Sequence, residues 1–278
     1  MPVPSISLLS IASVLFGGAA AGSDGKPQSC QAVDASILAS TGTPVGEEIV
    51  HNNITMYISR PDANDVRTEP RARAGVLYLT DVFGIALNEN KLLVDSFARA
   101  GYLALAPDLF SGSPAPGDIN VPGFNTTEFL ARHGPDVTDP VVATALAYMR
   151  DELGVELVLA PGYCFGGRYV FRFLAGDREA RVDAGFAAHP SMVGDDEIEA
   201  IAGPVSVAAA ENDALLTAEL RSEMESLLGQ TGRPYQVTLF SGTQHGFAVR
   251  ADLEDAEQRF AKEEAFLQAV RWFDRFVV

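Results

Sequence analysis

Residues 158–167 read VLAPGYCFGG, an apolar run followed by Gly-x-Cys-x-Gly-Gly. The run is typical of a buried strand, and residues 164–174 are typical of a helix. A reactive side chain between a strand and a helix is the nucleophile-elbow pattern, here with cysteine in place of serine. Glycines suit this pattern because the turn is sharp and neighbouring chain must come within contact distance. The stretch therefore predicts that Cys164 is a nucleophile, the alternative being a buried structural cysteine in a glycine-rich turn.

Two features of the predicted turn would support nucleophilic chemistry. The helix N-terminus lies beneath the sulfur and stabilises negative charge, which favours the thiolate form of Cys164. The backbone N–H of Phe165 would point at an oxyanion that develops during attack on a carbonyl carbon.

An alternation of strands and helices extends outward from this stretch. Apolar runs predict strands at 49–58, 75–79, 102–106, 155–160, 184–188, 205–210 and 235–240, with helices between the later ones and at the C-terminus. Such alternation predicts an α/β fold, a mostly parallel sheet with helices on both faces and a ligand site beyond the carboxyl ends of its strands. Residues 111–139, rich in proline and glycine, predict a long loop that could act as a lid.

An acid and a base follow Cys164 in the chain order that an elbow requires. Asp213 comes directly after the apolar run 205–210, where the acid of a triad belongs, although an aspartate there could also cap a helix. Glu211 is a weaker rival for the role. His245 lies in a glycine-flanked loop after the last predicted strand and can reach the elbow as the base. The sequence therefore predicts a triad of Cys164, Asp213 and His245.

The other histidines have weaker claims on the site. His189 follows a short predicted strand and is a candidate pocket residue, whereas His51 and His133 are expected to be structural or on the surface. The sequence contains no His-x-His or His-Glu-x-x-His spacing, no Gly-x-Gly-x-x-Gly and no Walker A motif. We therefore expect neither a metal nor a nucleotide cofactor.

Composition restricts the partners of the chain. It has 278 residues, of which 47% are hydrophobic, enough for one large α/β domain. Its formal net charge of −17 repels phosphate backbones and anionic lipid, so we expect no nucleic-acid partner and no membrane partner. A small molecule is the expected partner, and the composition leaves the oligomeric state open.

The N-terminus predicts secretion. Residues 1–21 carry no charged side chain and contain an apolar stretch that ends in Ala19-Ala20-Ala21, so we expect a signal peptide cleaved near Ala21 and a domain over 22–278. A short membrane anchor is the alternative, but the stretch is shorter than a stable span requires. In a secreted chain, Asn53 and Asn125 would be glycosylation acceptors. The state of the second cysteine, Cys30, stays open.

Several motifs, in a fixed order over residues 41–278, resemble the dienelactone hydrolase family and especially its fungal members. They are Gly42-Thr43-Pro44-x-Gly46, Asp81-Val82-Phe83-Gly84, Gly101-Tyr102, Ala106-Pro107-Asp108-Leu109-Phe110, the Cys164 stretch, His189-Pro190, Asp213 and His245-Gly246-Phe247-Ala248. The resemblance implies the α/β-hydrolase fold and the same triad. It also implies that the N–H of Val82 is the second oxyanion donor.

The resemblance extends less well to substrate recognition. Asp81 stands where bacterial members have a glutamate that helps to activate the thiol, and it is one methylene shorter. Those members also hold a substrate carboxylate with two arginines. Arg250 lies near one of these places, offset by about one residue, and Arg168 and Arg132 are candidates for the other.

We therefore predict a secreted hydrolase that cleaves an activated ester or an enol lactone through a cysteine nucleophile and a thioester intermediate. One alternative is a general short-chain carboxylesterase or thioesterase. The other is a secreted, non-catalytic binding protein on the same scaffold, which the intact triad disfavours.

Overall fold

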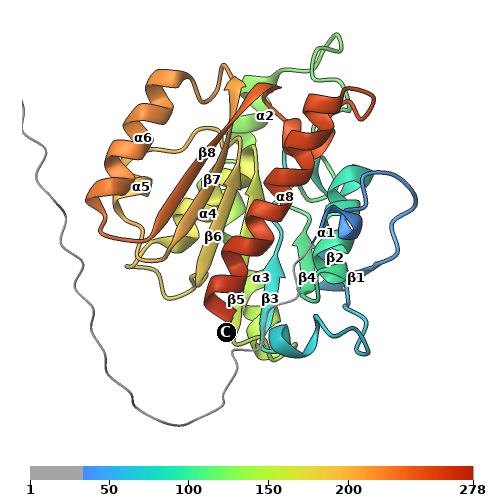
Figure 1. Ribbon diagram of the computed structural model, residues 1–278. Coiled ribbons are helices and arrows are strands. Elements are labelled where there is room, and N and C mark those ends of the chain that lie inside the picture. The colour runs from blue at the N-terminus through green and yellow to red at the C-terminus, as the bar shows by residue number, and fades with distance from the viewer. Residues whose placement is uncertain (1–33, 278) are drawn as a thin grey trace, which may run out of the picture. The chain divides into compact units, whose positions relative to one another are not determined.

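The strands that flank Cys164 belong to one eight-stranded sheet in the order β1-β2-β4-β3-β5-β6-β7-β8 (Figure 1). Strands β3 to β8 are parallel to one another, whereas β1 and β2 are antiparallel to their neighbours. The strands are β1 (Glu47–His51), β2 (Ile54–Ser59), β3 (Ala74–Leu77), β4 (Leu103–Pro107), β5 (Leu157–Tyr163), β6 (Ala184–Ala188), β7 (Val205–Asn212) and β8 (Tyr235–Gln244). The α/β-hydrolase fold predicted from the sequence is confirmed.

This computed structural model describes residues 34–277, which lie within one compact unit of the chain. The predicted signal peptide, residues 1–21, and Cys30 lie outside the described residues. Among the helices of residues 34–277, none is both long enough and apolar enough to cross a membrane.

Helices cover both faces of the sheet. They are α1 (Asn88–Arg99), α2 (Thr126–Arg132), α3 (Pro135–Asp151), α4 (Phe165–Leu174), α5 (Asp195–Glu199), α6 (Ala218–Gln230), α7 (Phe247–Arg250) and α8 (Ala256–Val277), with 3₁₀ turns at η1 (Ala35–Ile37), η2 (Glu69–Arg71) and η3 (Gly84–Ala86). Because side chains alternate across a strand, Val76 and Tyr78 pack with α1 and α8, while Leu77 and Leu79 pack with α3 and α4. Figure 1 shows α8 crossing one face of the sheet.

Two predictions about local structure were wrong. The strand predicted over 49–58 is a hairpin of β1 and β2, because Asn52 and Asn53 adopt positive φ angles of 48° and 62° and reverse the chain. Asparagine tolerates this conformation, which two-residue hairpin turns require.

The loop predicted over 111–139 contains α2 and the start of α3. The side chain of Asn125 caps α2 by accepting from the N–H of Glu128, and Pro135 occupies the first turn of α3, where a missing N–H costs nothing. Residues 111–139 are therefore not one continuous irregular loop.

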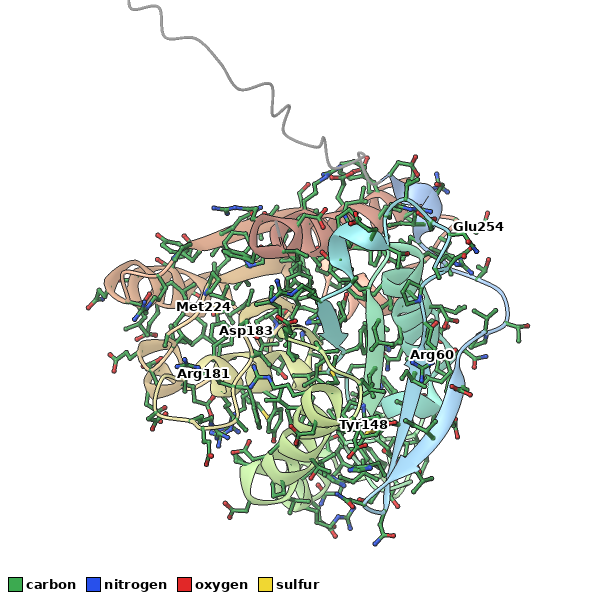
Figure 2. All side chains as sticks on the ribbon, turned by 90° about the horizontal axis from the view of Figure 1, so that it is seen from below. Arg60, Tyr148, Arg181, Asp183, Met224 and Glu254 are labelled. Atoms are coloured by element: carbon green, nitrogen blue, oxygen red, sulfur yellow. The ribbon has the colours of Figure 1, made fainter. Side chains whose placement is uncertain are left out.

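Polar side chains fasten the amino-terminal ends of the central strands. Asp183 lies just before β6, on the side of the molecule seen in Figure 2. Its Oδ2 accepts from the N–H of Val158 at 2.8 Å and from Arg150 at 3.2 Å, which connects β5, β6 and α3. The opposite, carboxyl-terminal ends of these strands carry the candidate site.

Candidate active site

Cys164 occupies a strained turn between β5 and α4. Its φ of 52° and ψ of −112° are unusual for a residue with a side chain and cost of order 1–3 kcal/mol. The turn is tight enough that a Cβ at Gly162 would overlap the backbone of Gly166, and a Cβ at Gly166 would overlap the backbone of Leu79. The two glycines are therefore required by the close packing of three chain segments, as the sequence pattern predicts.

His245 and Asp213 extend from the sulfur in a line of hydrogen bonds. His245 Nε2 lies 3.0 Å from Cys164 Sγ, and His245 Nδ1 lies 2.8 Å from Asp213 Oδ2. The other carboxylate oxygen of Asp213 accepts from the N–H groups of Leu215 at 2.8 Å and Leu216 at 3.2 Å. These bonds fix the carboxylate, and the carboxylate fixes the orientation of the imidazole.

The charges of this line are mutually stabilising. Burial by itself would lower the pKa of His245, but the hydrogen bonds to Asp213 and Cys164 and the negative charge of these groups raise it to about 10. Burial likewise opposes ionisation of Asp213, yet its hydrogen bonds with His245, Leu215 and Leu216 hold its pKa below the ordinary value. The geometry therefore favours a protonated His245 between the Asp213 carboxylate and the sulfur of Cys164.

The rival acid and the remaining histidines do not join this line. Glu211 is exposed and accepts from the N–H of Gly242. His51 stacks on Tyr148 at 4.6 Å, and Nδ1 of the buried His133 contacts the carbonyl oxygen of Phe129. Their positions agree with the structural and surface roles predicted for them.

The N–H groups of Phe165 and Val82 flank the elbow. Phe165 is the first residue of α4, and Val82 lies in the turn after β3, whose backbone is bonded to the elbow through the N–H of Gly166 and the carbonyl oxygen of Thr80. Within residues 34–277, neither N–H has a hydrogen-bond acceptor. Two such free N–H groups are of the kind that can hold the oxygen of an attacked carbonyl.

Asp81 supports the turn that carries Val82. Its buried Oδ1 accepts from Asn90 Nδ2 at 2.8 Å and from the N–H of Phe83 at 3.1 Å. Burial raises its pKa, against the lowering effect of Asn90 and of Arg250, whose Nε lies 3.7 Å from Oδ2. The described residues show no hydrogen bond between Asp81 and the sulfur, so a direct contact of Asp81 with the thiol is absent from this geometry.

His189 lies behind the imidazole of His245. Their ring centroids are 5.0 Å apart in an edge-to-face arrangement, and Phe247 packs 5.6 Å from His189. The ring is fully buried, and neither nitrogen has a hydrogen-bond partner in the described part of the chain. Burial lowers the pKa of His189 well below its ordinary value, so the ring is neutral. It is a wall beneath the site rather than a surface open to substrate.

The three predicted arginines differ in position. Arg250 lies at the site, where its guanidinium stacks over Phe83, 4.4 Å from the ring centroid. Arg168 is paired with the buried Glu197 at 2.9 Å, and Arg132 is paired with Glu128 at 3.1 Å on an exposed helix surface. The structure therefore brings Arg250 to the site and engages Arg168 and Arg132 with carboxylates.

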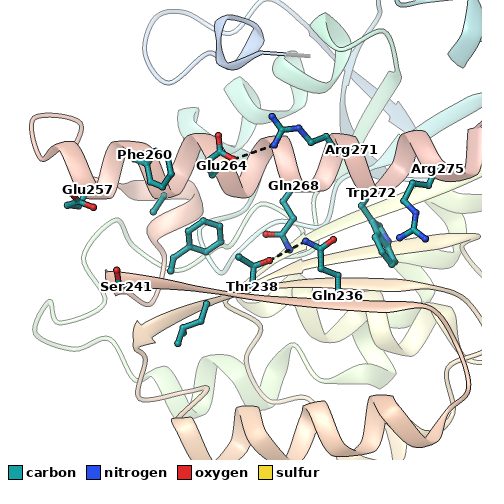
Figure 3. A pocket seen from close by; sticks show the side chains of 13 residues that line it. Gln236, Thr238, Ser241, Glu257, Phe260, Glu264, Gln268, Arg271, Trp272 and Arg275 are labelled. Carbon is teal, nitrogen blue, oxygen red and sulfur yellow. Dashed lines mark hydrogen bonds and ion pairs between the residues drawn. The ribbon is translucent and has the colours of Figure 1, made fainter. Parts of the chain in front are cut away.

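Other features of the described residues lie apart from this site. No group of three or more His, Cys, Asp or Glu side chains in residues 34–277 is arranged to hold a metal ion. A cavity of about 530 Å³ lies between β8 and α8 (Figure 3), and no member of the Cys164, Asp213 and His245 line contributes to its wall.

Comparison with known proteins agrees with this geometry. The model of the dienelactone hydrolase family matches residues 62–277. The chain belongs to the dienelactone hydrolase family.

Individual relatives of this dienelactone hydrolase family member are also hydrolases. It is 42% identical over 236 residues to "Hydrolase pyvD" of Aspergillus violaceofuscus, which covers 85% of this chain and 92% of that protein. It is 28% identical over 242 residues to "Dienlactone hydrolase 1" of Gibberella moniliformis, covering 84% and 88%. The predicted class, a carboxylic ester hydrolase, is confirmed.

Solved structures share the fold. A putative dienelactone hydrolase from Klebsiella pneumoniae superposes with a TM-score of 0.62 at 19% identity, covering 79% of this chain and 92% of that one. At this identity the likeness supports the α/β-hydrolase fold of the enzyme and nothing more.

The sequence did not predict two residues of the site, Asn90 and Ser191. Asn90, at the start of α1, holds Asp81 and accepts from the hydroxyl of Tyr78, and Ser191 Oγ lies 3.8 Å from the sulfur of Cys164. Ser191 directly follows His189-Pro190, so its place after a predicted strand was a usable sign. Asn90 gave no comparable sign, because its role depends on how α1 packs beside β3.

Proposed function

We propose that this hydrolase cleaves an activated ester or an enol lactone with Cys164 as nucleophile. The observation that carries the proposal is the continuous line from Sγ of Cys164 through the imidazole of His245 to Asp213, with distances of 3.0 and 2.8 Å. Such a line activates a nucleophile and returns a proton to the leaving group.

The reaction begins with attack of the Cys164 thiolate on the carbonyl carbon. The N–H groups of Val82 and Phe165 hold the oxyanion, and loss of one such donor typically costs about 3 kcal/mol of barrier. The C–O bond then breaks, His245 gives its Nε2 proton to the departing oxygen, and a thioester remains on Cys164. His245, held by Asp213, next takes a proton from water, and the resulting attack releases the acid and restores the thiolate.

The thiolate restricts the substrate. A thiolate leaves a tetrahedral intermediate easily, so the intermediate goes forward only when the ester oxygen is also a good leaving group. Phenyl esters and enol lactones satisfy this condition, whereas triglycerides and amides do not.

A general short-chain carboxylesterase is the second candidate. It is favoured by the ion pairs of Arg168 with Glu197 and of Arg132 with Glu128, which occupy two of the three predicted carboxylate-binding arginines. Arg250→Ala separates the two functions. It should weaken turnover of a carboxylated dienelactone at least tenfold and leave a neutral ester unchanged if the substrate carboxylate binds there.

The nucleophile is tested by trapping the thioester. Wild-type enzyme mixed with p-nitrophenyl acetate should release a burst of nitrophenol, and mass spectrometry should find an acetyl group on the peptide that contains Cys164. Cys30→Ser is the matched control and should keep both signals, while Cys164→Ala should lose both. Full hydrolysis by Cys164→Ala would refute the assignment.

We also propose that the enzyme is secreted after cleavage near Ala21. Asn53 and Asn125 support this by their exposure, the first in the β1–β2 turn and the second at the start of α2, where its Oδ1 rather than its amide nitrogen makes the cap. N-terminal sequencing and glycosidase treatment of protein from the culture medium test it, and an intact Met1 on cytosolic protein would refute it.

A further inference from the structure

An apolar cavity of about 100 Å³ lies beside the catalytic line, and the mechanism above does not use it. It lies between the residues that follow β6 and the beginning of α6. Apolar side chains dominate its wall: Met192, Ile198, Leu215, Leu216, Leu220 and Met224.

The chain segments that line the cavity also contact the catalytic line. Ser191 donates its N–H to the carbonyl oxygen of Cys164 at 3.2 Å and places its hydroxyl 3.8 Å from the sulfur. The next residue, Met192, lines the cavity. On the other wall, Leu215 and Leu216 hold the carboxylate of Asp213 with their N–H groups. The same short segments therefore build both the catalytic line and the cavity.

The strand order puts this cavity on one side of Cys164 and Arg250 on the other. The cysteine ends β5, which lies between β3 and β6 in the sheet. Arg250 contacts Asp81 and Phe83, in the turn that follows β3. The cavity wall comes from the segments after β6 and β7. In the order of the strands, Arg250 and the apolar cavity thus lie on opposite sides of Cys164.

The rim of the cavity selects against anions. Asp195 and Glu223 are its charged members, and both carry negative charge. Met192, Leu215 and Leu220 are 40%, 50% and 47% exposed and leave apolar surface uncovered around the opening. A neutral, apolar group fits this chemistry, and a carboxylate does not.

We propose that this cavity is an acyl-binding subsite for a short neutral group of about three to five carbons. Its volume of about 100 Å³ is smaller than that of an apolar cavity of about 150 Å³ known to hold benzene. The subsite takes the substituent on the carbonyl carbon, which stays beside the sulfur in both halves of the reaction. The inference rests on the proposed function, because it assumes that the acyl group is carried on Cys164.

The first test is a chain-length series of p-nitrophenyl esters. Wild-type kcat/KM should rise about fourfold for each CH2 added from acetate to pentanoate and then fall. Leu220→Trp, which fills the opening at an exposed position, should abolish the rise with chain length. Leu239→Trp is the matched control, since Leu239 is 46% exposed on β8 away from this cavity, and it should keep the rise.

The outcomes separate the two proposals. If the filled variant keeps the wild-type profile, or if length dependence follows the thiol part of aliphatic thioesters instead of the acyl part, the subsite assignment is wrong. If Cys164→Ala hydrolyses every ester of the series, the proposed nucleophile is wrong. The length profile of the wild-type enzyme then no longer supports a subsite for an acyl group on Cys164.

A binding measurement tests the subsite without turnover. In Cys164→Ala protein with ¹³C-labelled methionine methyl groups, methyl butanoate should shift the signals of Met192 and Met224. Met56 and Met149, fully buried elsewhere, serve as internal controls and should stay in place. Methyl acetate should produce a smaller shift. Unmoved Met192 and Met224 signals at millimolar methyl butanoate would overturn the proposal, whatever the kinetics show.

Discussion

Cys164 combines backbone strain with chemistry at one residue. Its positive φ places the sulfur above the start of α4 and in line with His245, a geometry that an ordinary backbone conformation would not give. A strained conformation of this kind persists only where the surrounding structure holds it. Here the close approach of β3, β5 and α4 supplies that support.

Relief of this strain should be measurable. We expect Cys164→Gly to be more stable than Cys164→Ala by about 1 kcal/mol, because glycine adopts the required φ without the cost that a Cβ adds. Both variants lack the sulfur, so the contacts with His245 cancel. Urea unfolding followed by circular dichroism gives the difference, and equal stability would show that the turn is not strained.

Asp213 should act through His245 and not through the fold. Asp213→Asn keeps the shape of the side chain but offers an amide to Nδ1, which disfavours the productive imidazole orientation, so kcat should fall about 10³- to 10⁴-fold. Glu211→Gln is the control and should change kcat by less than twofold. Matching melting curves for Asp213→Asn and wild type would exclude misfolding, while near-normal turnover would remove Asp213 from the mechanism.

At the scale of elements, the elbow depends on contact between β3, β5 and α4. A methyl group at Gly166 would overlap the backbone of Leu79 and Thr80, whereas one at Gly117 meets nothing within 4 Å. We expect Gly166→Ala to lose about 3 kcal/mol of unfolding free energy and most activity. Gly117→Ala should be neutral or slightly stabilising. A stable, active Gly166→Ala would mean that the three segments can separate without harm.

Sequence patterns predicted the central elements well and the periphery poorly. Strands β5 to β7 follow apolar runs that are mostly buried on both faces, so length and hydrophobicity alone indicate them. The β1–β2 turn was missed because two adjacent asparagines carry no glycine to mark it, and α2 was missed because prolines surround it.

Some residues of the candidate site could likewise be predicted from the sequence, and others could not. The residues at strand ends, Cys164, Asp213 and His245, could be placed from chain order and local context. The partners of Arg168 and Arg132 could not, since they depend on side chains from distant segments or on the unexpected helix α2. His189 looked like a pocket residue, and only the packing of His245 and Phe247 over it shows that it is enclosed.

At the scale of the whole molecule, one buried cation makes stability depend on pH. Lys262 on α8 is 2% exposed and donates to the carbonyl oxygen of Val249 at 2.8 Å. Burial lowers its pKa to about 8, below the 10.5 of a free lysine. The unfolded chain therefore binds more protons between pH 8 and 10.5, and this group makes the protein more stable as pH rises through that window.

Lys262→Met should remove this dependence. The variant should be more stable than wild type at pH 7, where wild type bears the full cost of burying the charged ammonium group. The difference in unfolding free energy between the two proteins should narrow by up to about 1.4 kcal/mol per pH unit above pH 8. His245 works in the opposite direction, since its raised pKa gives stability that is full below pH 6.5 and lost toward pH 10. Because His245 is present in both proteins, it cancels from the difference. If the difference in unfolding free energy between the two proteins does not change with pH, the ammonium group of Lys262 is hydrated in the folded protein and this prediction is wrong.

The pairing of Cys164 with His245 has a consequence for how the enzyme ages in the presence of oxidants. The thiolate that the proposed mechanism requires is also the form of cysteine that peroxides oxidise fastest, first to a sulfenic acid and then irreversibly to a sulfinic acid. Cys164 is 9% exposed, so small oxidants can reach it. The enzyme should therefore lose activity in dilute hydrogen peroxide, regain it with a thiol reductant only at early times, and age chemically faster than a serine hydrolase in the same medium.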